Sequence, residues 1–205
     1  MAKETTSPKG RAVAGAVKPV LRPKHEIRII GGLWKRSKLQ VADRPGLRPT
    51  PNRVRETLFN WLGQDLTGWC CVDAFAGTGA LGFEAASRGA SEVWMCEQDG
   101  GLVTQLKDTQ AKLQAGAVRI TRGDAVAALR QLAPQSMDLV FLDPPFDSTL
   151  FDFALPAAAA VLKPAGSIYL EAALEWTNER LTPFRLKVFR HLKAGAVHAH
   201  LLKAV

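Results

Sequence analysis

The chain has 205 residues, of which 47% are hydrophobic and 22% are charged, a composition typical of one globular domain. No apolar run approaches the roughly 18 residues that span a membrane, and the first residues are polar, so neither a membrane anchor nor a secretory signal is predicted. The three cysteines fit neither a disulfide framework nor a zinc motif, which favours a reducing, cytoplasmic compartment.

Positive charge is concentrated near the N-terminus. Residues 1–55 contain 14 Lys and Arg against three Asp and Glu, whereas residues 56–205 carry a small negative charge, within a net charge of +8. A basic segment ahead of a mildly acidic body is typical of a protein that binds nucleic acid.

The first predicted elements are a hairpin and a helix. Residues 27–41 are expected to form a short β-hairpin that turns at Gly31-Gly32. After a proline-rich loop, a helix is predicted to run to about Leu62, with Thr50 or Asn52 as its N-cap.

Strand and helix patterns alternate through the middle of the chain. The expected strands are Trp69–Phe75, Glu92–Glu97, Ala117–Arg122, Met137–Asp143 and Ser167–Glu171, and the helices between them are Ala80–Arg88, Gly101–Ala115, Ala125–Leu132 and Leu150–Leu162. This alternation predicts an α/β fold with a doubly wound, mostly parallel sheet and helices on both faces. Two further runs, 184–193 and 196–204, predict an antiparallel hairpin at the C-terminus.

A glycine-rich turn follows the first of these strands. Gly77, Gly79 and Gly82 fit the pattern G-x-G-x-x-G between strand and helix, which lets a ligand approach the backbone at a helix N-terminus. The same pattern also suits a plain turn that needs small residues. The candidate cofactor contacts here are Asp73, Phe75, Ala76, Gly77, Thr78, Gly79 and Ala80.

Three carboxylates narrow the choice of cofactor. Glu97, followed by Gln98, ends the second strand, where it can accept hydrogen bonds from ribose hydroxyls. Asp73 would repel the pyrophosphate of a dinucleotide but favours the sulfonium and ammonium groups of S-adenosylmethionine, although it could instead cap loop amides. Asp124, followed by Ala125, could bind the adenine amino group, cap a helix, or do both. We therefore expect S-adenosylmethionine.

The sequence Asp143-Pro144-Pro145-Phe146 ends the fourth strand. The fourth strand lies beside the first in such folds, so Asp143 is expected near the methyl donor. An amine on a nucleobase is a poor nucleophile, because its lone pair is delocalised into the ring. Hydrogen bonds from its N–H groups to the Asp143 carboxylate and the Pro144 carbonyl would free that pair, and Asp143 or water would take the proton.

The aromatic residue of this turn completes the predicted chemistry. Phe146 can stack on a base and fix its plane. The pattern therefore predicts methyl transfer to an exocyclic amine of a nucleobase, with no metal, since there is no clustered His/Cys ligand set. The alternatives are an ordinary turn at a strand end for the four residues and a core position for Phe146.

With these motifs, the chain resembles the bacterial guanine-N2 methyltransferases of small-subunit (16S) ribosomal RNA. The resemblance covers about residues 27–203 and is carried by the blocks 27–32, 46–62, 73–82 and 143–146. Asn52 is a departure, because that position usually carries Asp in the family pattern. The resemblance implies a class I methyltransferase with a seven-stranded sheet, a monomer, and a guanine of assembled or assembling 30S particles as the substrate, with ribosomal proteins as candidate further partners.

The basic N-terminal part is expected to bind the RNA around a looped-out guanine. The candidate contacts are Lys35, Arg36, Lys38, Arg48, Arg53 and Arg55, each of which could instead be surface charge. The expected organisation is a mobile basic arm over 1–25, an RNA-facing hairpin and helix over 26–66, and a methyltransferase domain over 67–205.

Other functions share some of these features. A DNA adenine-N6 methyltransferase can use the same Asp-Pro-Pro-aromatic turn, but the chain lacks room for a sizeable DNA target-recognition domain. A non-catalytic RNA-binding assembly factor could retain the fold. A nicotinamide oxidoreductase is disfavoured by Asp73 beside the glycine loop.

Overall fold

The computed structural model describes residues 27–40, 50–145 and 149–205. The strands are β1 Ile27–Arg28, β2 Lys38–Leu39, β3 Cys70–Asp73, β4 Glu92–Glu97, β5 Val118–Arg122, β6 Met137–Leu142, β7 Leu162–Ala172, β8 Leu186–Ala194 and β9 Val197–Ala204. The helices are α1 Asn52–Trp61, α2 Ala80–Ser87, α3 Gly100–Leu113, α4 Ala125–Gln131, α5 Phe151–Val161 and α6 Asn178–Leu181, followed by one 3₁₀ turn, Thr182–Phe184.

Seven strands form the central sheet in the order β5-β4-β3-β6-β7-β9-β8. The first five run parallel, whereas β9 pairs antiparallel with both β7 and β8. β1 and β2 form the separate antiparallel hairpin predicted for the N-terminal region, but each strand has only two residues, and the pairing of Ile29 with Ser37 centres the turn beyond the predicted Gly31-Gly32. The predicted fold class, a doubly wound, mostly parallel α/β sheet with an antiparallel C-terminal hairpin, is confirmed.

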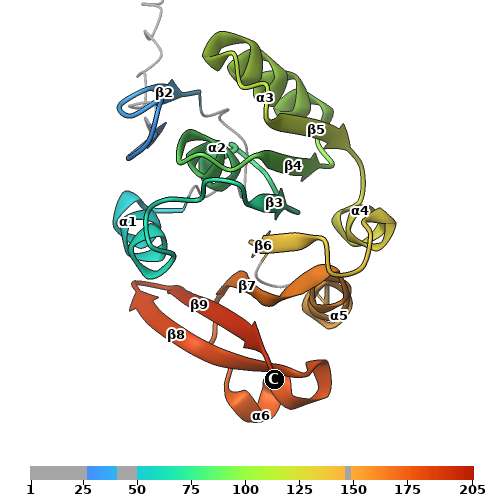
Figure 1. Ribbon diagram of the computed structural model, residues 1–205. Helices are drawn as coiled ribbons and strands as arrows, with labels where there is room; N and C mark the ends of the chain where they lie inside the picture. The colour runs from blue at the N-terminus through green and yellow to red at the C-terminus, as the bar shows by residue number, and fades with distance from the viewer. Residues whose placement is uncertain (1–26, 41–49, 146–148) are drawn as a thin grey trace, which may run out of the picture.

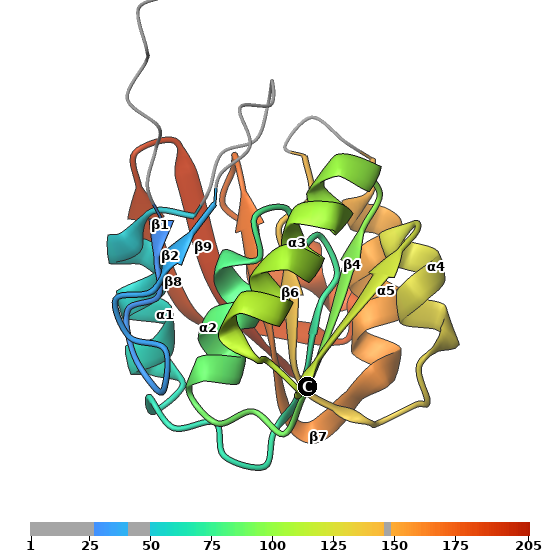
Figure 2. The same cartoon turned by 90° about the horizontal axis from the view of Figure 1, so that it is seen from above.

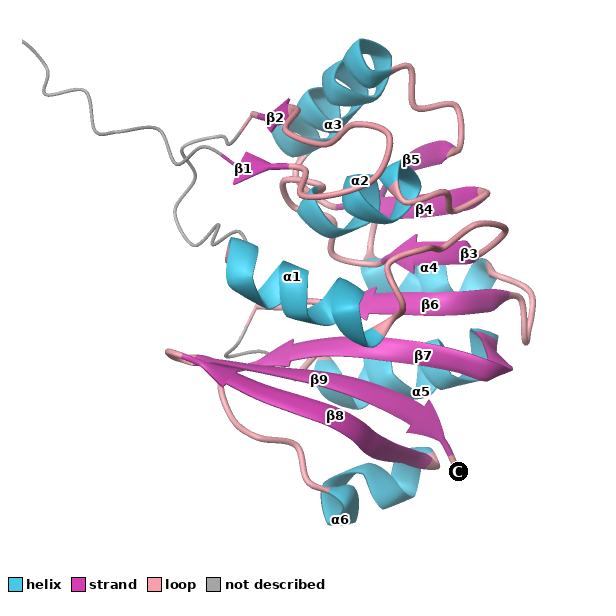
Figure 3. Ribbon diagram, turned by 60° about the vertical axis from the view of Figure 1, so that its left-hand side comes forward, coloured by secondary structure: helices cyan, strands magenta, loops and turns pink. Residues whose placement is uncertain are grey.

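Helices cover both faces of the sheet (Figure 1). α1, α2 and α3 lie on one face, and α4, α5 and α6 lie on the other (Figure 3). The sequence of β6 explains this layering, because Leu139 and Phe141 pack into one core cluster while Val140 and Leu142 pack into the other. A parallel strand that is buried on both faces must be apolar on both.

The order of the strands creates a switch point between β3 and β6. β3 connects through α2 to β4 on one side, and β6 connects through α5 to β7 on the other. The two strands pair directly, with Asp73 opposite Phe141. Ligands of doubly wound sheets bind at the carboxyl ends of the strands beside such a point. We therefore expect Asp73 and Asp143 to line the ligand site.

The N-terminal hairpin and α1 are docked on the α2 side of the sheet (Figure 2). Ile29 of the hairpin region and Leu58 of α1 belong to the same buried cluster as the sheet residues. The carboxylate of Glu84, in α2, accepts hydrogen bonds from the backbone N–H groups of Ile30 and Gly31, both at 2.8 Å. These contacts hold the hairpin against α2.

Three local predictions need correction. The residue that caps α1 is Pro51, and neither Thr50 nor Asn52 caps it, because the Thr50 hydroxyl bonds to Glu171 and the Asn52 amide oxygen accepts from Arg55. β7 begins at Leu162 rather than Ser167, because Leu162 already pairs with Met137. α6 and its 3₁₀ turn were not predicted.

The helices of the described residues are also too short or too polar to cross a membrane.

Candidate active site

The glycine loop between β3 and α2 is shaped by two left-handed residues. Gly77 has φ of 51° and Gly79, which precedes α2, has φ of 78°. A Cβ on Gly79 would lie 2.6 Å from Phe83 Cδ2 and 2.7 Å from Leu106 Cδ2. Glycine is therefore required at position 79 for both its backbone conformation and its packing.

Replacing Gly79 by alanine is expected to destabilise the protein by more than about 1–2 kcal/mol, the backbone cost alone, and to weaken cofactor binding. Gly63→Ala is the matched control, because Gly63 also has positive φ (91°) but a Cβ there would meet nothing within 4 Å. Urea unfolding of both variants checks this result. Equal losses would contradict a packing requirement at Gly79.

Asp73, the last residue of β3, is hydrogen-bonded to the start of α2 across the glycine loop. Its side chain is 1% exposed, and its Oδ2 accepts a hydrogen bond from the backbone N–H of Gly82 at 2.9 Å. Burial raises the pKa of Asp73 to about 7. The hydrogen bond from Gly82 opposes this rise, and the nearby negative charges of Glu97 and Glu171 add to it. Asp73 therefore does accept from backbone amides, at Gly82 in α2 and at Phe75 in the loop, and it also lies near other carboxyl groups.

Glu97 ties the loop to the end of β4. Its Oε2 accepts from the N–H of Gly77 and its Oε1 from the N–H of Asp99, both at 2.8 Å. A carboxylate has about four acceptor positions, so two remain for a ligand. The neighbouring Gln98 is exposed at the same edge of the sheet.

Asp124 caps α4, the second of the two roles predicted for it. Its Oδ1 accepts from the N–H of Ala127 at 2.8 Å. The residue is exposed, while Ala125 behind it is buried. Capping occupies one carboxylate oxygen, so the other oxygen can serve a ligand at this edge.

Asp143 directly follows β6, next to the end of β3. It is half-buried, Pro144 is buried and Pro145 is exposed, while Phe146 lies outside the described residues. Burial raises the pKa of Asp143 well above its ordinary value, and the charges of Glu171 and then Asp73 raise it further. The structure thus brings Asp73 and Asp143 together from two strands.

Glu171 is a third carboxyl beside Asp73 and Asp143, and it was not predicted from the sequence. These three residues form the carboxyl cluster. Glu171 follows Leu170, the partner of Leu142, so it lies level with Asp143 on the neighbouring strand. It is 3% exposed and its Oε1 accepts from the Tyr169 hydroxyl at 2.8 Å. Its position at the end of a predicted parallel strand was a usable signal, the same one that identified Asp143.

Comparison with known proteins assigns the chain to a family. The model of the family described as Conserved hypothetical protein 95 matches residues 27–203. A protein named Ribosomal RNA small subunit methyltransferase D from Haemophilus influenzae is 39% identical over 185 residues, which cover 87% of this chain and 94% of that one. Its namesake from Escherichia coli is 46% identical over 135 residues, covering 64% and 68%. The chain belongs to this family.

A solved structure supports the same assignment. The chain superposes on the putative methyltransferase yhhF from Escherichia coli with a TM-score of 0.76 and 39% identity, over 87% of this chain and 98% of that one. The protein is thus a methyltransferase of this family, as the resemblance in its sequence implied.

The basic residues of the methyltransferase do not form one surface. Lys35, Arg36, Lys38 and Arg53 are exposed, and Arg48 lies outside the described residues. The hairpin turn with Lys35 and Arg36 lies against Ser87, at the end of α2 far from the glycine loop (Figure 2). Arg53 is on the first turn of α1, close to Thr50 and hence to the carboxyl cluster.

Arg55 is a correction, because it is not a surface residue. Its side chain is 0% exposed, and it donates to Glu84, to the Arg28 carbonyl and to the Asn52 amide oxygen. A guanidinium with these partners holds α1, α2 and the hairpin together. It is not available to a phosphate, and charge patterning alone could not separate it from Arg53.

Three histidines form a second polar cluster, on β8 and β9. The ring nitrogens of His191, His198 and His200 lie within 4.8 Å of one another, which could suit a metal ion. However, the His200 Nε2 accepts a hydrogen bond from the Trp176 N–H at 3.0 Å, so its lone pair is already used. Burial lowers the pKa of His200 to about 4. The three rings stack on one another and pack the hairpin.

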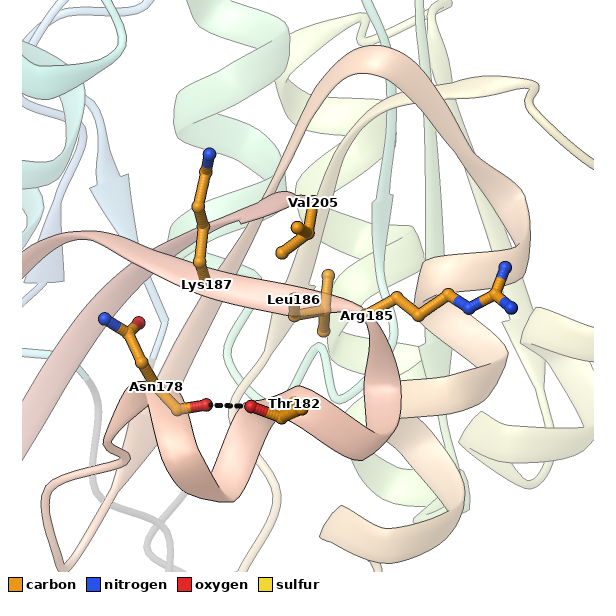
Figure 4. Close-up of a pocket in the computed structure, with 6 residues that line it drawn as sticks. All are labelled: Asn178, Thr182, Arg185, Leu186, Lys187 and Val205. Carbon is orange, nitrogen blue, oxygen red and sulfur yellow. Dashed lines mark hydrogen bonds between the residues drawn. The ribbon is translucent and has the colours of Figure 1, made fainter.

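A surface hollow of about 600 Å³ lies away from the carboxyl cluster (Figure 4). It is placed where β8 begins and β9 ends, which is the opposite edge of the sheet from Asp143. The residues that line it are Asn178, Thr182, Arg185, Leu186, Lys187 and Val205. Its position separates it from the glycine loop and from the chemistry.

Proposed function

We propose that the protein transfers a methyl group from S-adenosylmethionine to the exocyclic N2 amine of a guanine in 16S ribosomal RNA, within assembled or assembling 30S particles. The observation that carries this proposal is the meeting of Asp73 and Asp143 at the switch point, beside the glycine loop. Membership of a family whose relatives are named as small-subunit ribosomal RNA methyltransferases supports the choice of RNA.

The residues of the site suit this cofactor better than a dinucleotide. Asp73 and Glu171 are buried and Asp143 is half-buried, and no ion pair among the described residues neutralises this acidic group. Such a group repels a pyrophosphate and favours a cation. S-adenosylmethionine, when bound, supplies a sulfonium methyl group and a positive charge. In this proposal Glu97 would bind the ribose hydroxyls and Asp124 the adenine amino group.

Asp143 would act on the amine. In its ionised form the carboxylate accepts an N–H hydrogen bond, and the Pro144 carbonyl accepts the second, which localises the lone pair on the nitrogen. As the N–C bond forms, the C–S bond breaks and the nitrogen loses one proton, either to Asp143 or to water. The proposed role of Phe146 is to stack on the base. Most of the rate gain would come from holding the two reactants in line.

The substrate can be tested directly with a methyl-transfer assay. The purified full-length protein is offered radiolabelled cofactor with 30S particles, naked 16S RNA or DNA, and the methylated nucleoside is identified by mass spectrometry. We expect N2-methylguanosine from the particle or its RNA. Methylation of DNA alone would instead favour adenine-N6 activity, and the absence of cofactor binding would favour a non-catalytic RNA-binding role. We further propose a cytoplasmic monomer that contacts ribosomal proteins.

Arg53→Glu is expected to weaken RNA binding without changing cofactor affinity. Arg53 is exposed on the first turn of α1, near the carboxyl cluster, and a lost phosphate contact lowers both the affinity and its salt dependence. Arg130→Glu is the control, because Arg130 is exposed on α4, across the sheet. Filter binding at several salt concentrations checks this. Equal RNA affinity of the two variants would show that α1 is not part of the RNA-binding surface.

A further inference from the structure

The carboxyl cluster contains more negative groups than the proposed chemistry needs. Asp143 can accept the amine hydrogen bond alone, and Asp73 already caps the glycine loop. Glu171 is 3% exposed and receives two hydroxyl donors, Tyr169 at 2.8 Å and Thr50. Glu171 is thus a buried glutamate on the strand next to Asp143, and two hydroxyl groups are placed to donate to it. This arrangement indicates a role in the reaction.

The topology fixes Asp143 and Glu171 at the same level of the sheet. β6 and β7 are parallel, with Phe141 opposite Tyr169 and Leu142 opposite Leu170. The next pair is Asp143 and Glu171, whose side chains point to the face occupied by the Phe141 and Tyr169 rings, because alternate residues share a face. Adjacent strands lie about 4.8 Å apart, so these two carboxyl groups are close neighbours.

Two neighbouring carboxyls, one buried and one half-buried, cannot both ionise without a large electrostatic cost, so they share a proton. Burial raises the pKa of Glu171, but the hydroxyl groups of Thr50 and Tyr169 donate to this carboxylate and oppose the rise by favouring its charged form. Asp143 has burial and two negative neighbours, all of which favour its protonated form. The proton of the pair therefore belongs on Asp143.

We propose that Glu171 is a positioning residue for methyl transfer: its carboxylate keeps a proton on Asp143 in the free enzyme, and Asp143 gives up that proton when the cationic methyl donor binds. This inference rests on the proposed function. It means that Asp143 becomes an acceptor for the amine only after the cofactor is in place. One O–H bond of Asp143 breaks, and its proton goes to solvent.

The other groups around Asp143 act in the same direction. From β3, Asp73 adds negative charge, and Glu97 of β4 acts on Asp73 in turn. From β7, the Tyr169 hydroxyl stays neutral, because burial and Glu171 raise its pKa. Within the described residues, Asp143 and Glu171 take part in no ion pair with Lys or Arg.

Proton release can be counted by calorimetry. Binding of S-adenosylmethionine to the full-length protein is measured near pH 7 in phosphate and in Tris, whose ionisation enthalpies differ, and the difference in heat gives the protons released. S-adenosylhomocysteine is the matched ligand, because it lacks the methyl group and the sulfonium charge. We expect more protons to be released with the sulfonium ligand, by up to about one per site. Equal numbers would overturn the proposal without any variant.

Glu171→Gln identifies the residue responsible. The change keeps the shape but removes the charge, so Asp143 is already ionised in the free enzyme and proton release falls toward zero, while cofactor affinity is retained. The acid limb of the pH–rate profile should move to lower pH by about one unit or more. Glu175→Gln, at an exposed carboxylate just beyond β7, is the control and should change neither readout.

The outcomes separate this inference from the proposed function. No detectable heat with either ligand would mean that the protein does not bind the cofactor, and the function itself would fail. Binding with an unchanged proton count in folded Glu171→Gln would refute the role of Glu171 and leave the function standing. Glu171→Asp, which restores a charge on a shorter side chain, should recover part of the release.

Discussion

Replacement of Asp143 by alanine is expected to lower the rate of methyl transfer to RNA by about 10²- to 10⁴-fold while S-adenosylmethionine still binds. The carboxylate stands at the switch point, beside Asp73 and Glu171, where the amine of a looped-out guanine would meet the methyl donor. Removing it takes away the acceptor that localises the amine lone pair. It does not remove Glu97 or the glycine loop, which hold the rest of the cofactor.

Two measurements make this prediction specific. Single-turnover methyl transfer to 30S particles gives the rate, and calorimetry gives the cofactor affinity of the same variant. Asp152→Ala is the control, because Asp152 is exposed in the first turn of α5, beyond the turn that Asp143 begins. Full activity of Asp143→Ala would remove Asp143 from the mechanism, and loss of cofactor binding would make its role one of binding instead.

The sequence was a reliable guide to the sheet because the parallel strands are buried on both faces. Runs such as Met137–Leu142 are apolar throughout, and the turns between strand and helix carry glycine or a capping aspartate. Local patterns failed where long-range pairing decides. The early start of β7 depends on the pairing of Leu162 with Met137, and α6 has only four residues, too few for a periodic pattern.

The positions of candidate site residues were predictable where an acidic residue stands at or just after the end of a predicted strand. Asp73, Glu97, Asp124 and Asp143 all follow that rule, and the structure places them along one edge of the sheet. Two charged residues could not be recognised as buried from the sequence, because their burial depends on tertiary contacts. Glu171 was passed over and Arg55 was assigned to RNA, because a sequence does not show that a charge has a buried partner.

Glu84→Gln is expected to destabilise the protein by about 3–5 kcal/mol, the cost of removing one partner of a buried ion pair. Glu84 is 0% exposed, and its two oxygens contact Arg55 at 3.2 Å and Arg88 at 2.9 Å. Burial lowers the pKa of Arg55, and Glu84 opposes that shift. Without the carboxylate, two guanidinium groups would stay buried with no negative partner.

The glutamine would also put an NH₂ donor where one of the two N–H groups, that of Ile30 or that of Gly31, now donates, so the hairpin should loosen as well. The matched control is Glu92→Gln, because Glu92 forms an exposed pair with Arg119 at 2.7 Å, and such a pair contributes about 0–1 kcal/mol. Urea unfolding compares the two variants. Similar losses would mean that apolar packing of Ile29 and Leu58 holds the N-terminal elements, and that the buried ion cluster instead specifies their orientation at little net gain in stability.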